Sequence, residues 1–183
     1  DVIDCFVIEG SGNASGLLPG VAIIARSTWA SFSAKRLLRV EWDESAGAHH
    51  TSATYASKAA DRAKSPGANL RTDGDVEAAF ASAATVIEAA YAYPFLNHAT
   101  LEPQGCTAWA TGDGIEFWTT SQSPEWGREL ISKTLAIPPE KLKMNLVRGG
   151  GGFGRRLSND ALVEAAALAL RTGGKPVKLT WTR

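Results

Sequence analysis

Cysteine and histidine are scarce in this chain, which has two cysteines and three histidines among 183 residues. Cys5 and Cys106 lie far apart in the sequence, and neither belongs to a CxxC pair, so no zinc-binding spacing is present. The two cysteines could form one disulfide or stay as free thiols, and the sequence leaves both alternatives open.

Excess charge and long apolar runs are also lacking. Lysine plus arginine and aspartate plus glutamate each total 19, so nothing favours a nucleic acid or an anionic membrane as partner. No apolar run approaches the roughly 18 residues of a membrane span, and no secretory signal is visible. The chain begins without methionine and both ends fall on strand-like segments. We therefore expect a piece of a larger protein, so a missing signal says little about location.

The 44% hydrophobic content is typical of a globular chain with one domain or two small ones. Before Glu44, three short strands are predicted around a helix that Ser27 or Thr28 can cap. From Glu44 to Leu70 the residues are small and polar, which predicts a surface connection with one helical stretch. The predicted strands here are Val2 to Ile8, Val21 to Ala25 and Arg39 to Trp42, and the helical stretch is Ser52 to Ala63.

The remaining sequence predicts a β-β-β-α-β-α-β order, a mixed α/β (α+β) fold with helices packed on mixed sheets. Two alternating segments flank Gly112-Asp113-Gly114, which is a strong hairpin signal. Asp75 can cap a short helix before the first strand, TVIEAAYAYPF. Longer helices are predicted to begin at Pro124 and at Asn159. The last strand is expected within Lys175 to Arg183.

The run GGGGFGRR stands between a strand-like and a helix-like segment. Bare backbone there would let an anion approach the N–H groups of a helix start. A P-loop would need a lysine and a hydroxyl residue where Arg155 and Arg156 stand. Gly149, Gly151 and Gly154 satisfy GxGxxG and would favour an NADP-type dinucleotide site, but no carboxylate ends the next strand. A tight turn alone explains one or two glycines, not five.

A wider set of motifs narrows these alternatives. HATLEPQGC, TTSQSPEWGRELISKTLAIPPEKLKMNLVRGGGGFGRR and VEAAALALRTGGKPVKLTWTR resemble the molybdenum-binding large subunit of the xanthine oxidase and aldehyde oxidase family. The likeness is to its isoquinoline 1-oxidoreductase beta subunit branch, which includes bacterial aldehyde dehydrogenases. It implies oxidation of an aldehyde or an N-heteroaromatic substrate with water-derived oxygen. It also implies molybdopterin cytosine dinucleotide with molybdenum in the complete protein; we expect none in the isolated chain.

The resemblance also implies a division into domains. Residues 1–48 resemble the second half of the family's hammerhead domain. Residues 49–72 form a linker, and residues 73–183 resemble the N-terminal part of the molybdopterin-binding domain. An alternative reading is a non-catalytic interaction module.

Candidate site residues are carried over from the family pattern. Gln122 matches a glutamine whose amide lies close to an oxygen of the metal, although a helix-entry glutamine can also bond only backbone. Phe153 and Leu157 are expected on the substrate side; purine-oxidising relatives carry a glutamate at the position of Leu157. Phe153 could instead be a hydrophobic plug under the loop. The expected cofactor-binding residues are Gln122, Gly151, Gly152, Phe153, Gly154 and Arg155.

Other carried-over residues have less specific roles. Arg155 and Arg156 could pair a cofactor phosphate or a partner domain. His98 and Glu102 are expected to form a buried structural pair, and Cys106 is expected to be buried. No direct metal ligand is expected.

The resemblance also indicates what the chain does not contain. The family's catalytic base, a glutamate, would lie beyond Arg183, so this chain has no expected catalytic residue and alone should be inactive. An iron–sulfur subunit or another electron-transfer partner is implied for the complete enzyme. A piece of a larger protein would also leave sheet edges and domain faces exposed, so we expect it to self-associate. The family branch suggests a periplasmic or inner-membrane-associated location.

Overall fold

The computed structural model describes all residues from 1 to 183, which divide into two compact units. One unit combines Asp1–Arg39 with Asn97–Arg183, and the other is Val40–Leu96. The mixed α/β class predicted from the sequence is confirmed, because two sheets and five α-helices are present. The division into residues 1–48, 49–72 and 73–183 stays a prediction.

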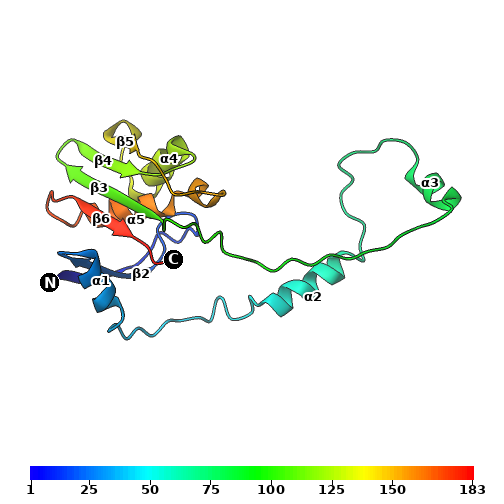
Figure 1. Cartoon of the computed structure of the whole chain (residues 1–183), viewed down its shortest axis with the longest axis horizontal. Coiled ribbons are helices and arrows are strands. Elements are labelled where there is room, and N and C mark those ends of the chain that lie inside the picture. The colour runs from blue at the N-terminus through cyan, green and yellow to red at the C-terminus, as the bar shows by residue number, and fades with distance from the viewer. The chain divides into compact units, whose positions relative to one another are not determined.

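A four-stranded mixed sheet lies at the centre of the first unit (Figure 1). Its strands are β3 (Gly105–Thr111), β4 (Gly114–Thr119), β5 (Leu142–Leu146) and β6 (Val177–Thr180). They are ordered β5-β4-β3-β6, with β4 parallel to β5 and β3 antiparallel to both β4 and β6. The predicted hairpin is confirmed, with Gly112 and Asp113 between β3 and β4.

Two helices, α4 (Pro124–Leu135) and α5 (Asp160–Ala169), pack with this sheet around one core. Ile115 and Phe117 are buried on β4 at alternate positions, as the period of a strand requires. Helix α5 is buried at seven of its ten residues, which explains its alanine-rich composition. The core cluster consists of Cys106, Ala108, Ile115, Phe117, Ile131, Leu142, Leu162, Val163, Ala165, Ala166 and Ala169.

A separate antiparallel hairpin is formed by β1 (Val2–Ile8) and β2 (Gly20–Ala25). Helix α1 (Thr28–Lys35) follows, and its predicted cap is present because the Ser27 hydroxyl accepts a hydrogen bond from the N–H of Ala30. The predicted strand Arg39 to Trp42 is wrong. No neighbouring strand pairs with these residues, and a strand exists only through such pairing.

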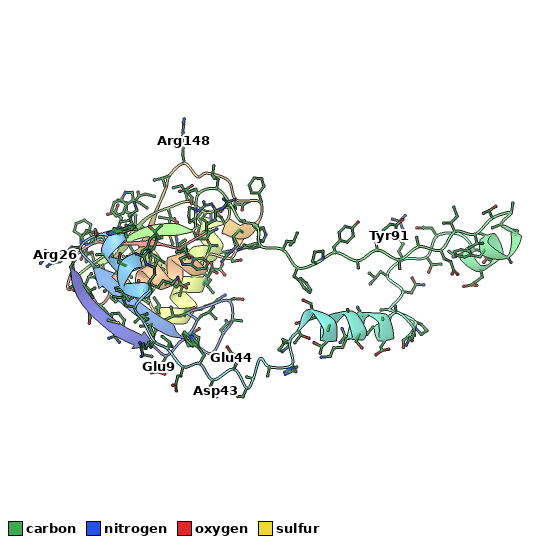
Figure 2. The ribbon with its side chains drawn as sticks, turned by 60° about the horizontal axis from the view of Figure 1, so that its bottom comes forward. Glu9, Arg26, Asp43, Glu44, Tyr91 and Arg148 are labelled. Atoms are coloured by element: carbon green, nitrogen blue, oxygen red, sulfur yellow. The ribbon has the colours of Figure 1, made fainter.

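The second unit contains α2 (Ser52–Arg62) and α3 (Val76–Ser82). Thr51 and Thr54 form a reciprocal capping box at α2, and the Asp75 carboxylate accepts from the N–H of Ala78 at α3. The predicted strand from Thr85 to Phe95 is wrong, because this segment pairs with no other strand of the chain. Tyr91 lies on this segment (Figure 2). It is 82% exposed.

Both cysteines are free, Cys5 exposed and Cys106 buried, so no disulfide joins them. The predicted burial of Cys106 is confirmed, and that burial raises the pKa of its thiol to about 12. No helix in the structure combines the length and the apolar character that crossing a membrane requires. Two short 3-10 helices, η1 (Pro139–Lys141) and η2 (Arg155–Leu157), flank β5 and the glycine-rich segment.

Candidate functional site

The glycine loop, defined here as residues 147–159, leads from β5 to α5. Because β4 and β5 are parallel, their carboxyl ends lie at the same edge of the sheet, and the segments that follow them meet there. The N–H of Val147 donates to the carbonyl of Thr119 at 3.0 Å, and the N–H of Gln122 donates to the carbonyl of Arg156 at 3.2 Å. The loop is therefore attached to the segment that joins β4 to α4.

The side chain of Gln122 reaches into the glycine loop. Its Oε1 accepts a hydrogen bond from the N–H of Gly154 at 3.1 Å. Its Nε2 group has no hydrogen-bond partner in the structure, so both N–H bonds are free to donate. The Gln122 oxygen bonds backbone, as expected of a glutamine at a helix entry. Its Nε2 group bonds nothing in the structure and stays available for a ligand.

The loop leaves room for this amide only because it lacks side chains at the contact. A Cβ atom at Gly152 would lie 2.8 Å from Cδ of Gln122, closer than non-bonded carbon atoms approach. Gly154 has a φ of +90°, which glycine adopts without steric cost. The N–H groups of Gly151, Gly152 and Phe153 make no hydrogen bond. Together with Gln122 Nε2 they form a set of unpaired donors.

Arg156 lies beneath the loop, with 5% of the residue exposed. Its Nε donates to the carbonyl of Gly151 at 2.7 Å, and its Nη2 donates to the carbonyl of Glu102 at 3.1 Å. Nη1 donates to the hydroxyl of Thr120. Both interpretations of Arg156 from the sequence, a phosphate ligand and a partner-domain contact, are therefore replaced by an internal role: it holds the loop to the segment before β3.

Arg155 is engaged in a different network. Its Nη1 and Nη2 atoms lie 3.0 and 2.7 Å from the two carboxylate oxygens of Asp160, and its guanidinium lies 5.0 Å from the ring centroid of Trp181. The hydrogen bonds to Asp160 raise the pKa of Arg155 above its ordinary value. Trp181 donates to Glu164 at 2.7 Å, and burial raises the pKa of Glu164. Contact between Arg155 and a cofactor phosphate stays a prediction.

Phe153 and Leu157 are exposed apolar side chains of the loop. Phe153 is 78% exposed and Leu157 is 43% exposed. The Phe153 ring lies close to Gly151 rather than under the loop, so the interpretation of Phe153 as a buried plug is wrong for this chain. Its φ of +51° falls in the left-handed region, where a non-glycine residue is uncommon.

The expected buried pair of His98 and Glu102 is also wrong, because both residues are exposed and no hydrogen bond joins them. Glu102 instead accepts from the N–H of Gly150 and lies 3.3 Å from Nη2 of Arg156. His98 lies at the other side of the loop, where its Nε2 would be 3.7 Å from a Cβ atom at Gly154. Both residues therefore line the loop, but through separate contacts.

Asn159 is a site residue that sequence reasoning missed. It is 4% exposed, and its side chain bonds to residues on both sides of Gln122 as well as to the glycine loop. The sequence indicates Asn159 only as the start of a helix. The signal that could have found it is an asparagine directly before an apolar helix, since asparagine tolerates the left-handed conformation.

The donor set fits an anionic, oxygen-rich group. Between Val147 and Asn159 the loop carries three arginines and no acidic residue. Unpaired N–H groups on bare backbone bind such groups without adding bulk. No cluster of three or more His, Cys, Asp and Glu that could hold a metal ion is present. The residues present thus suit the organic and oxygen-bearing parts of a cofactor.

Comparison with known proteins identifies relatives of this chain. The family model described as molybdopterin cofactor-binding domain matches residues 61–183. An aldehyde oxidoreductase molybdenum-binding subunit, PaoC of Escherichia coli O157:H7, is 39% identical over 112 residues, covering 60% of this chain and 15% of the relative. Isoquinoline 1-oxidoreductase subunit beta of Brevundimonas diminuta is 31% identical over 190 residues, covering 96% of this chain and 24% of the relative.

Two further similarities extend over most of the chain. A membrane-bound aldehyde dehydrogenase [pyrroloquinoline-quinone] of Gluconacetobacter polyoxogenes is 32% identical, covering 89% of this chain and 21% of the relative. Quinoline 2-oxidoreductase of Pseudomonas putida 86 has a similar fold, with a TM-score of 0.61 at 21% identity, over 90% of this chain and 22% of that structure. The chain spans between 15% and 24% of the lengths of these proteins.

Proposed function

This chain belongs to the molybdopterin cofactor-binding domain family, among the molybdenum-binding subunits of the xanthine oxidase group, and we propose that its glycine loop forms one wall of the cofactor site. The complete subunit would oxidise an aldehyde or an N-heteroaromatic substrate with oxygen derived from water. The relatives named for aldehydes and for isoquinoline support this substrate range. The molybdenum cofactor, when bound, would supply the redox chemistry.

The observation that carries the proposal is the orientation of Gln122. Its oxygen is occupied by the N–H of Gly154, and its Nε2 group is free beside the unpaired N–H groups of Gly151 to Phe153. An amide donor can bond an oxygen of a metal centre without adding charge. Residues proposed to hold the cofactor are Gln122, Gly151, Gly152, Phe153, Gly154 and Arg155.

Phe153 and Leu157 are proposed to contact substrate. Both are apolar and exposed, so they would lose contact with water when an aromatic ring or an alkyl chain binds. Leu157 has no carboxylate that could hydrogen-bond to a purine, which supports a neutral heterocycle or an aldehyde as the substrate. The catalytic base is proposed to come from a part of the subunit outside residues 1–183.

The cytosine dinucleotide form of the cofactor is a finer proposal, resting on the resemblance to bacterial members of the family. An iron–sulfur subunit is proposed as the electron-transfer partner, and a periplasmic or inner-membrane-associated location is proposed on the same ground. The isolated chain is proposed to be inactive and to self-associate. The apolar side chains between Val86 and Leu96 support self-association, since six of them are at least half exposed.

The NADP-type alternative is disfavoured by the topology. In a dinucleotide-binding unit, the strand before GxGxxG and the strand after the helix are neighbours in one sheet. Here these strands are β5 and β6, which stand at opposite edges of the sheet.

Metal analysis of the full-length gene product, expressed with the cofactor-assembly machinery, tests the proposal. We expect close to one molybdenum atom per chain and oxidation of aromatic aldehydes. Molybdenum near zero would leave the interaction-module alternative as the better account of this chain.

A further inference from the structure

We propose that Asn159 is the positioning residue of this site: its buried carboxamide holds Gln122 in the orientation that leaves Nε2 free. The inference rests on the proposed function for its consequence in catalysis, but its structural part can be tested alone. Neither the family match nor the relatives assign a role to this residue.

The hydrogen bonds of Asn159 converge on the two neighbours of Gln122. Its Oδ1 accepts from the hydroxyl of Ser121 at 2.6 Å. Its Nδ2 carries two N–H bonds and lies 3.1 Å from the carbonyl oxygen and 3.0 Å from the hydroxyl oxygen of Ser123; it shares these donors with the carbonyl oxygen of Leu157. The residues on both sides of Gln122 are therefore bonded to one side chain, Ser121 through its hydroxyl and Ser123 through its carbonyl and its hydroxyl.

The same carboxamide also holds the glycine loop. Nδ2 lies 2.9 Å from the carbonyl of Leu157, and the Ser123 hydroxyl donates to that carbonyl at 3.1 Å. Gln122 meets the loop twice, through its N–H to the carbonyl of Arg156 and through Oε1 to Gly154. Asn159 thus joins the two segments whose relative position sets the Gln122–Gly154 contact.

Backbone geometry explains why asparagine stands at this position. Asn159 has a φ of +56° and a ψ of +13°, in the left-handed region that asparagine, aspartate and glycine tolerate. A Cβ atom at Gly127 would lie 3.1 Å from Cγ of Asn159, so helix α4 presents bare backbone to the carboxamide. The residue is 4% exposed, so its hydrogen bonds have no competition from water.

The first experiment is a crystal structure of the full-length protein with Asn159→Gly, which keeps the left-handed backbone and removes the carboxamide. We expect the distance from Gln122 Oε1 to Gly154 N to exceed about 3.5 Å, the limit of a hydrogen bond. An unchanged distance of 3.1 Å would overturn the proposal. Should this variant fail to fold, Asn159→Asp is used instead, because it keeps the shape and the acceptor oxygen but removes both donors. The distance from Gln122 Oε1 to Gly154 N then tests the proposal in the same way.

The second experiment is a kinetic double-mutant cycle. Gln122→Ala and Asn159→Gly should each lower kcat by about 10- to 100-fold, the range for residues that orient ligands of a metal centre. The double variant should be no slower than Gln122→Ala, because Asn159 acts through Gln122. Losses that multiply would overturn the proposal.

A control separates positioning from general stability. Ile131→Val shortens a fully buried side chain of α4 that makes none of these hydrogen bonds, so kcat should be unchanged while the midpoint of unfolding falls. If the wild-type protein held no molybdenum, the proposed function would fail, and the crystallographic distance would still decide the role of Asn159.

Discussion

The buried guanidinium of Arg156 lies 3.3 Å from the carboxylate of Glu102, a residue 54 positions earlier in the chain. Glu102 also accepts a hydrogen bond from the N–H of Gly150, so one carboxylate contacts both the glycine loop and the arginine beneath it. This pair connects the segment before β3 to the loop after β5. It explains how a loop so rich in glycine can keep a defined shape.

Arg156→Ala is expected to destabilise the fold by about 2 kcal/mol, because it leaves the buried hydroxyl of Thr120 and two partly buried carbonyls without partners. The measurement is the free energy of unfolding in urea. Arg148→Ala is the matched control, since Figure 2 shows Arg148 on the same loop pointing away from the unit, and its cost should stay within about 0.5 kcal/mol. Equal losses for the two variants would contradict the internal role of Arg156.

Gln122→Glu should reduce turnover by about 10-fold or more while the midpoint of unfolding stays close to that of the wild type. Glutamate keeps an oxygen for the N–H of Gly154 but removes the free donor. Gln122→Ala should lower turnover as well, with the fold intact. Steady-state kinetics and a thermal melt of the full-length protein make the comparison, and unchanged turnover in both variants would show that the proposed role of Gln122 is wrong.

Gly152→Ala should displace the Gln122 side chain, because the added carbon would lie 2.8 Å from its Cδ. We expect molybdenum content or turnover of the full-length protein to fall by about 10-fold. Gly112→Ala is the control, since a Cβ atom there meets nothing within 4 Å. Metal analysis and kinetics measure both variants. If Gly152→Ala has the same molybdenum content and turnover as Gly112→Ala, the close contact between Gly152 and Gln122 does not matter for function.

The two cysteines should differ in reactivity. Cys5 is exposed, whereas burial raises the pKa of Cys106 to about 12, so a thiol reagent at pH 8 should modify Cys5 at once and Cys106 only after unfolding. Counting labelled sites by mass spectrometry, before and after adding denaturant, checks this. Rapid modification of Cys106 in the native protein would rule out its burial.

The raised pKa of Cys106 also predicts a pH dependence of stability. The unfolded thiol ionises near pH 9.0 and the folded one near 12, so the folded state retains the proton longer. The contribution of this thiol to the free energy of unfolding is fully present below pH 9. Between pH 9 and pH 12 it decreases by about 1.4 kcal/mol for each pH unit. Urea unfolding at pH 8 and pH 10 should show a smaller decrease for Cys106→Ala than for the wild type.

Much of the fold could be predicted because its signals are local. The turn at Gly112 and Asp113, the cap at Asp75 and the start of α4 at Pro124 each depend on a few adjacent residues, and the structure has all three. The motif around GGGGFG likewise placed the candidate site at the end of β5, because its glycines and flanking residues stand in one short run.

The segment from Thr85 to Phe95 shows where such reasoning fails. Its residues have strand propensity, but a strand also needs a neighbour to receive its hydrogen bonds, and no other segment of this chain supplies one. The same limit applies to Arg39 to Trp42. Strand pairing depends on two segments, so the sequence of one segment alone cannot predict it.

The sequence by itself thus determined the secondary structure with local signals, the family and the position of the glycine loop. Only the tertiary structure decided which side chains contact the loop and which are exposed on it. It turned Arg156 inward, left Phe153 exposed, paired Arg155 with Asp160 and placed Asn159 between the neighbours of Gln122. The contacts of Asn159 and Arg156 join residues that stand 36 to 54 positions apart, so their geometry exists only after the sheet has brought these segments together.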